Sequence, residues 1–223
     1  MKKLTQTIPI VTPTLADAVD LGLVASFARP GGNVTGITPY IDGLPAKQMQ
    51  FAREVVPAAG KIGILGNMND PKAPPQRREL EDAGRKLAVA IIAPEIGNPE
   101  DLDGAMLELA RERVDVVIVL QTTMLLSERR GIAELAIADR LPCIYGYREH
   151  VDDGGQISYG VDLRWCFRRS AALVHKILNG IPPSEVPVEF PAGLEMVVNL
   201  TTAKALGLTV PPPLLARADE VID

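Results

Sequence analysis

The chain has 223 residues, of which 47% are hydrophobic, 23% are charged and 4% are aromatic, and its net charge is −5. This composition is typical of a globular protein with one large or two small α/β domains. The acidic charge and the few aromatic rings argue against a nucleic-acid-binding surface, and no apolar run is long enough to span a membrane. Two cysteines and two histidines predict neither a disulfide framework nor a metal site.

The first residues do not have the pattern of a signal peptide. Met1-Lys2-Lys3 is basic, but the segment after it is too polar and too rich in proline for the apolar part of a signal. Ile8–Val11 instead predicts a short buried strand, so we expect a chain that begins inside a fold and has no export signal. Apolar residues at 19, 23, 24 and 27 predict a helix, which Pro30-Gly31-Gly32 ends before a buried strand at Val34–Ile37.

Between residues 61 and 145, predicted strands alternate with predicted helices. The helices begin near Pro74, Asn98 and Ser127, where proline or a capping side chain favours a helix start. Such an alternation predicts βαβ units in a mainly parallel, Rossmann-like sheet. The predicted strands are Lys61–Gly66, Val89–Ala93, Val114–Leu120 and Pro142–Tyr145.

The carboxyl-terminal part begins with a long predicted helix. Asp162 caps it and Gly180 ends it. A proline-rich connector, a strand around Leu194–Val198 and a short helix capped by Thr201 follow. The buried face of the long helix is predicted to hold Leu163, Phe167, Ser170, Val174 and Ile177.

Sequence motifs of enzymes are missing from the chain. It has no GxSxG, no GxGxxG, no Walker A motif and no HExxH. A cysteine–histidine pair built on Cys143 or Cys166 is the remaining catalytic hypothesis, although a buried thiol is more often a small hydrophobic group. We therefore predict a protein that is not an enzyme, with no cofactor and no metal, whose two cysteines are not bonded to each other.

Polar loops follow several predicted strands at their carboxyl ends, where open parallel sheets bind ligands. Their neutral donors and acceptors suit a small polar solute, while turn formation, helix capping and packing of buried rings are the structural alternatives. Arg148 either binds a ligand carboxylate or pairs with Glu149 or Asp152. The predicted ligand-binding residues are Thr12, Asn67, Asn69, Gln121, Thr122, Tyr147 and Tyr159.

Five segments resemble one family, the ABC-transporter solute-binding proteins with the type I periplasmic-binding-protein fold. They are Gly22–Ile37, Leu141–Gly146, Gly155–Gly160, Ile177–Gly180 and Glu195–Pro211. The resemblance implies two Rossmann-like lobes with parallel sheets, and family members carry further residues before the Ile8 strand, so the first lobe is expected to be incomplete. Residues 1–57 with 146–190 would form this partial amino-terminal lobe. Residues 60–145 with 191–223 would form the carboxyl-terminal lobe.

The resemblance also implies a function. The chain would capture a small solute, an amino acid or a related carboxylate, between its lobes, and deliver it to ABC permease subunits in the periplasm. A cytoplasmic ligand-sensing module of the same fold, a truncated relative that binds nothing and a Rossmann-like enzyme are the alternatives. Uncovered surfaces of the incomplete lobe would favour a homodimer.

Overall fold

The computed structural model describes residues 4–39 and 41–223 and divides the chain into two compact units. The first unit consists of Met1–Ile41 and Val161–Gly193, and the second of Asp42–Gly160 and Leu194–Asp223. The second unit therefore includes residues 42–57 and 146–160, which the family resemblance placed in the first lobe.

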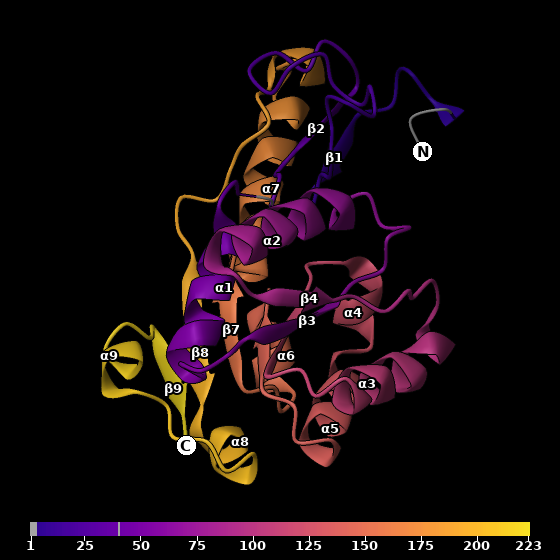
Figure 1. Ribbon diagram of the computed structural model, residues 1–223. Coiled ribbons are helices and arrows are strands. Elements are labelled where there is room, and N and C mark those ends of the chain that lie inside the picture. The colour runs from indigo at the N-terminus through magenta and orange to yellow at the C-terminus, as the bar shows by residue number, and fades with distance from the viewer. Residues whose placement is uncertain (1–3, 40) are drawn as a thin grey trace. The chain divides into compact units, whose positions relative to one another are not determined.

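A seven-stranded sheet forms the centre of the second unit (Figure 1). Its strand order is β4-β3-β5-β6-β7-β8-β9, and every neighbouring pair is parallel except β7 and β8. Strand β7 lies within residues 146–190, which the family resemblance placed in the first lobe, but it pairs with β6 and β8 of this sheet. The strands are β3 (Lys61–Leu65), β4 (Ala90–Ile92), β5 (Val116–Val119), β6 (Cys143–Tyr145), β7 (Ile157–Gly160), β8 (Glu195–Asn199) and β9 (Glu220–Ile222).

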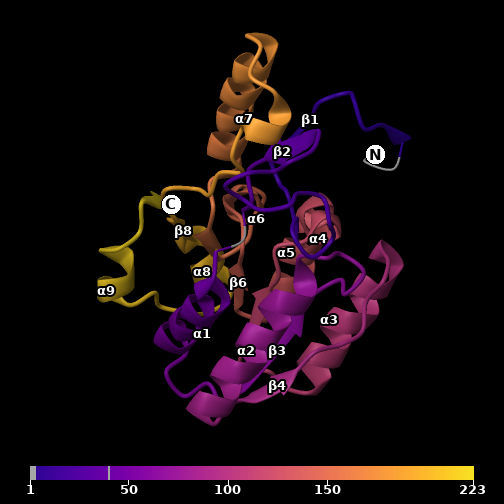
Figure 2. The same ribbon diagram turned by 90° about the horizontal axis from the view of Figure 1, so that it is seen from above.

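Helices cover both faces of this sheet (Figure 2). One core joins α1 and α2 to Ile62, Ile64 and Ile118, and the other joins α3 and α5 to Val117 and Val119. Alternate residues of each buried strand thus face opposite helix layers, which explains why the strands are apolar throughout. The helices are α1 (Leu44–Val55), α2 (Ala73–Leu87), η2 (Pro99–Asp101), α3 (Leu102–Arg111), α4 (Thr123–Ser127), α5 (Arg129–Ala138), α6 (Arg148–Asp152), α8 (Leu200–Ala205) and α9 (Pro212–Leu215).

Two helix caps differ from those predicted. Thr122 caps the short helix α4, whereas Ser127 hydrogen-bonds back to the Thr123 carbonyl inside it. Asn199 caps α8 by accepting from the Thr202 N–H at 2.9 Å, so Thr201 is not the cap. The helix predicted after Ser127 is α5, which begins at Arg129 with Glu128 at its N-cap, whereas α8 begins earlier than predicted because Asn199 caps it.

The first unit contains β1 (Ile10–Thr12) and β2 (Val34–Gly36), which pair in parallel, together with α7 (Leu163–Leu178) and η3 (Pro183–Glu185). The predicted cap of α7 is confirmed, since Asp162 accepts from the Trp165 N–H at 3.0 Å. Gly36 lies so close to β1 that a Cβ atom there would be 2.0 Å from the Thr12 carbonyl oxygen. Only glycine fits this strand pairing.

Two further expectations for the first unit are wrong. The helix expected over residues 19–27 is a series of turns, because Asp17 and Gly22 adopt positive φ angles of 45° and 61°. The buried face of α7 holds Leu163, Cys166, Ser170 and Leu173. Phe167 and Val174 were predicted inward, but they are 61% and 40% exposed.

Candidate functional site

The second unit has a topological switch point between β3 and β5. The chain leaves β3 through α2 on one face, passes β4, and returns to β5 through α3 on the other face. The loops after β3 and β5 therefore diverge, and this arrangement opens a crevice at the carboxyl ends of the strands in α/β sheets. Residues 66–72 and 120–122 form these loops, so the candidate site is built from them.

Gln76 of α2 joins the two sides of the switch point. Its Oε1 accepts from the Gln121 N–H at 2.9 Å, and its Nε2 donates to the Gln121 carbonyl at 3.3 Å and the Lys72 carbonyl at 2.7 Å. Gln121 in turn donates from Nε2 to the Gly146 carbonyl at 2.8 Å. These two buried amides close the end of β5 and fix the loops around it.

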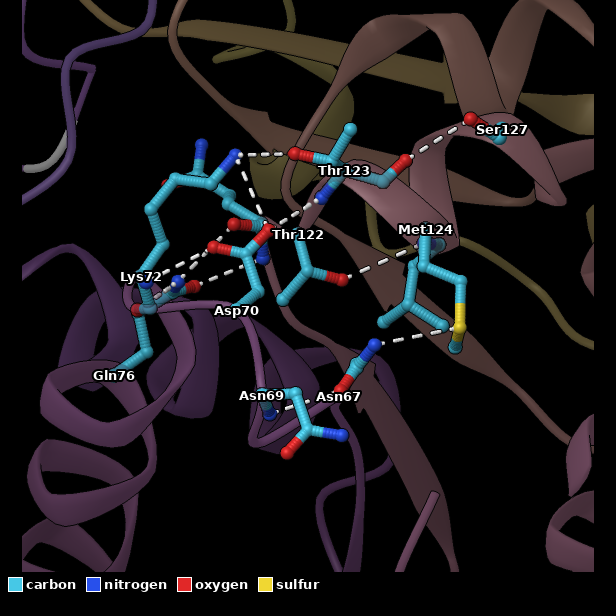
Figure 3. Close-up of polar contacts among 11 residues, drawn as sticks. Asn67, Asn69, Asp70, Lys72, Gln76, Thr122, Thr123, Met124 and Ser127 are labelled. Atoms are coloured by element: carbon cyan, nitrogen blue, oxygen red, sulfur yellow. Dashed lines mark hydrogen bonds and ion pairs between the residues drawn. The ribbon is translucent and has the colours of Figure 1, made fainter. Parts of the chain in front are cut away.

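Three side chains form a charged cluster beside this amide pair (Figure 3). The Asp70 carboxylate accepts from the Thr123 N–H at 2.8 Å and from the Lys72 N–H at 3.0 Å. Lys72 Nζ lies 3.3 Å from Thr123 Oγ1 and 3.7 Å from Asp70 Oδ2. Burial lowers the pKa of Lys72, and the Asp70 charge opposes this shift in part.

Asn67 and Asn69 follow β3 but differ in exposure. The buried Asn67 accepts from the Asn69 N–H at 2.9 Å, and its Nδ2 lies 3.4 Å from the Gly97 carbonyl oxygen and 3.5 Å from Met124 Sδ. This is Asx-turn geometry, the structural alternative for this loop. The Asn69 side chain is exposed and points away from Lys72 and Thr123 (Figure 3).

The remaining predicted residues are spread more widely. Thr122 is fully buried and accepts from the Leu125 N–H at 3.4 Å. Tyr147 is buried at the start of α6, with its ring 6.4 Å from that of His150. Tyr159 packs edge-on against Phe51 of α1 at 4.7 Å.

Burial, followed by the nearby Asp219 charge, raises the pKa of Tyr159. Thr12 belongs to the first unit, where its hydroxyl accepts from the Thr14 N–H. The structure thus brings Asn67, Asn69, Gln121 and Thr122 together at the switch point. The ligand role of all seven predicted residues stays a prediction.

Asp70, Lys72, Gln76 and Thr123 were not among the predicted residues. Asp70 and Thr123 adjoin predicted positions. Lys72 carries one signal in the sequence, a charge directly after a strand-end loop and just before the Pro74-Pro75 helix start.

Arg148 forms ion pairs inside the fold, and the predicted pair with Asp152 is one of them. It contacts the carboxylates of Asp152, Glu195 and Glu220 at 3.3, 2.6 and 2.9 Å. Burial alone would lower the pKa of Arg148, but these carboxylates raise it overall. Arg148 therefore ties α6 to β8 and β9.

The thiols of Cys143 and Cys166 are both buried and are not bonded to each other, as predicted. Burial raises the pKa of the Cys143 thiol to about 12, so this thiol stays protonated at neutral pH. Among residues 4–39 and 41–223 there is no group of three or more metal-ligating side chains. No helix in these ranges is long and apolar enough to cross a membrane.

Comparison with known proteins places the whole chain in one family. Residues 1–222 match the family described as ABC transporter substrate binding protein. A tyrosine-binding protein of Clostridioides difficile (strain R20291) is 26% identical over 204 residues. That alignment covers 92% of this chain and 58% of the relative, so the chain spans little more than half of its length.

Solved structures show the same fold. A conserved domain protein from Vibrio cholerae has a TM-score of 0.90 at 27% identity, covering 98% of this chain and 73% of that one. An ABC domain in complex with L-Trp from Streptococcus pneumonia has a TM-score of 0.89 at 21% identity, covering 99% and 75%. The expected α/β fold of type I periplasmic binding proteins is thereby confirmed.

Proposed function

Because the chain belongs to the family of ABC transporter substrate-binding proteins, we propose that it is the solute-binding component of an ABC-type uptake transporter. Its solute is an amino acid or a related small carboxylate. The family match over residues 1–222 carries this proposal. Members of the family are binding proteins, so the solute is held and released unchanged. They act in the periplasm or outside the cell, which makes the periplasm the site of action and ABC permease subunits the partners.

Two observations support an amino acid as the solute. The relative from Clostridioides difficile is named a tyrosine-binding protein, and the domain from Streptococcus pneumonia was solved with L-Trp. The switch point offers neutral amides and hydroxyls next to one cation and one carboxylate, a set that suits a zwitterion. The residues proposed to bind the solute are Thr12, Asn67, Asn69, Gln121, Thr122, Tyr147 and Tyr159.

A ligand panel tests this function. Purified protein is heated with each of the twenty amino acids and with small organic acids, and the shift in its unfolding midpoint is measured. A ligand at a hundred times its dissociation constant adds about 2.7 kcal/mol to the free energy of unfolding. No shift for any amino acid or organic acid of the panel contradicts the proposal. A chemically altered product, detected by mass spectrometry after incubation, contradicts the assignment as a binding protein.

Besides the permease subunits, we propose a second copy of this chain as a partner, and a surface of the first unit supports this homodimer. A groove of about 300 Å³ lies between β1 and α7 and is lined by Pro9, Val11, Val174, Ile177 and Leu178. Leu178 is 80% exposed, and in the described residues β1 pairs with β2 alone. The apolar side of α7 and the adjacent strand edge carry no charge. Two copies of this surface can therefore pack together across a twofold axis without bringing like charges together. A homodimer through this surface would cover both.

A further inference from the structure

The buried ammonium group of Lys72 at the switch point has fewer hydrogen-bond acceptors among the described residues than it can use. Its side chain is only 9% exposed, yet within 3.5 Å its ammonium has one hydrogen-bond partner in the described part of the chain, Thr123 Oγ1 at 3.3 Å. An ammonium group has three hydrogens to donate. The Asp70 oxygen at 3.7 Å attracts the charge but lies beyond good hydrogen-bond distance.

Asp70 is oriented by other groups. Its two oxygens accept from the backbone N–H groups of Lys72 and Thr123 at 3.0 and 2.8 Å. The carboxylate therefore shapes the loop after β3 and holds it to the start of α4. Removing an ammonium group from water costs several kcal/mol, and a partner at this distance offsets only part of that cost. An anion bound beside Lys72 would supply the missing contacts.

The neighbours of the ammonium are suited to such an anion. The Thr123 side chain is exposed, and its hydroxyl can donate to an oxygen that also contacts Lys72 Nζ. Both groups lie at the carboxyl ends of β3 and β5, where the two loops diverge. A carboxylate fits two donors of this kind, because its two oxygens accept several hydrogen bonds.

We propose that Lys72 Nζ and the Thr123 hydroxyl bind the carboxylate of the solute. This assignment rests on the proposed function and narrows it: the solute must carry a carboxylate, and its amine analogue without that group binds weakly. Lys72 is then the residue of the second unit that selects an acid.

The test compares two ligand pairs by isothermal titration calorimetry. The probes are L-tyrosine with tyramine and L-tryptophan with tryptamine, each pair differing by one carboxylate. The variants are Lys72→Met and Thr123→Val, with Lys86→Met as the matched control, because Lys86 is exposed near the end of the same helix. For the amino acid that the wild type binds, we expect Lys72→Met to raise the dissociation constant about 10- to 100-fold, the effect of losing a hydrogen bond between charged groups.

The same variant should change the dissociation constant of the matching amine less than threefold. Lys86→Met should change neither. Far-ultraviolet circular dichroism and thermal unfolding should show that ligand-free Lys72→Met still folds, because the backbone N–H groups of residues 72 and 123 continue to hold the Asp70 carboxylate. Such a result separates a binding role from a structural one.

Equal binding of the amino acid by the wild type and Lys72→Met overturns the carboxylate site and leaves the proposed function standing. So does an equal loss of affinity for the acid and the amine. If the wild type binds neither amino acid here and no member of the ligand panel above, both the proposed function and this site are overturned. If the panel gives another ligand, the same comparison is made with that ligand and its analogue without the carboxylate.

Discussion

Replacing Gln76 with leucine should destabilise the second unit strongly. Gln76 is 2% exposed and makes three hydrogen bonds, two of them to the backbone of Gln121. Leucine has a similar size but leaves the buried N–H and carbonyl of Gln121 without these partners. Each unsatisfied buried group costs about 1–3 kcal/mol, and the added apolar burial returns about 1 kcal/mol. For the two Gln121 groups together, we expect the free energy of unfolding to fall by about 1–5 kcal/mol.

Urea unfolding followed by far-ultraviolet circular dichroism measures this loss. Tryptophan fluorescence is unsuitable, because the single tryptophan, Trp165, lies in the first unit. Hydrogen exchange at the Gln121 amide should speed up in the variant, since this amide loses its acceptor. Gln50→Leu is the control: Gln50 is exposed on α1, and its loss should change stability by less than about 0.5 kcal/mol. Equal midpoints for both variants, with unchanged exchange at Gln121, would refute the reasoning.

Three further predictions concern other parts of the chain. Burial lowers the pKa of His150 to about 4, below its value of about 6.5 in the unfolded chain. Above about pH 6.5, His150 is neutral in both states and its contribution to the free energy of unfolding is constant. As the pH drops from 6.5 to 4, the free energy of unfolding should fall by about 3 kcal/mol. In urea titrations His150→Phe should remove this part of the pH dependence, whereas the exposed His175→Gln should keep it. Gly160→Ala should cost at least about 3 kcal/mol or prevent folding, because its Cβ would lie 1.8 Å from a carbonyl oxygen of the neighbouring strand end. Gly104→Ala, with open space around it, should raise the free energy of unfolding by about 0.5–1 kcal/mol. A Gly160→Ala variant that unfolds at a higher temperature than Gly104→Ala would contradict the packing argument. Light scattering should show a dimer that Leu178→Glu converts to a monomer, and a wild-type monomer at high concentration would rule out the dimer surface.

Local patterns predicted the strands of the second unit well. Val116–Val119 is apolar at every position and becomes a central strand, because a sheet covered on both faces needs no polar alternation. The short strand β9 was not predicted, since Glu220 and Val221 are exposed and only pairing with β8 keeps the segment extended. Its structure depends on the partner rather than on its own residues.

Helical spacing was less reliable in the first unit. Val19, Leu23 and Phe27 repeat at helical intervals, but the positive φ angles of Asp17 and Gly22 stop the chain after one turn. Single-sequence periodicity cannot detect such angles at a non-glycine residue.

The candidate site was predictable as loops but not as a cluster. Strand ends point to Asn67 and Gln121 because parallel strands share one carboxyl edge. The contact between Lys72 and Thr123 joins residues 51 positions apart. It depends on where α4 starts. Helix capping, the structural alternative for Thr122, sets this start.

The discontinuous first unit delays its own completion during synthesis. The Thr35 hydroxyl of β2 donates to the Val186 carbonyl at 2.7 Å, across 151 residues of chain. At about 5–20 residues per second, a ribosome needs about 8–30 s to make that stretch. The strands β3, β5, β6 and β7 leave the ribosome in this interval and can pair first. The early β1 and β2 can pair with each other, but they must wait this long for the Val186 segment, which makes this nascent segment a natural client for chaperones.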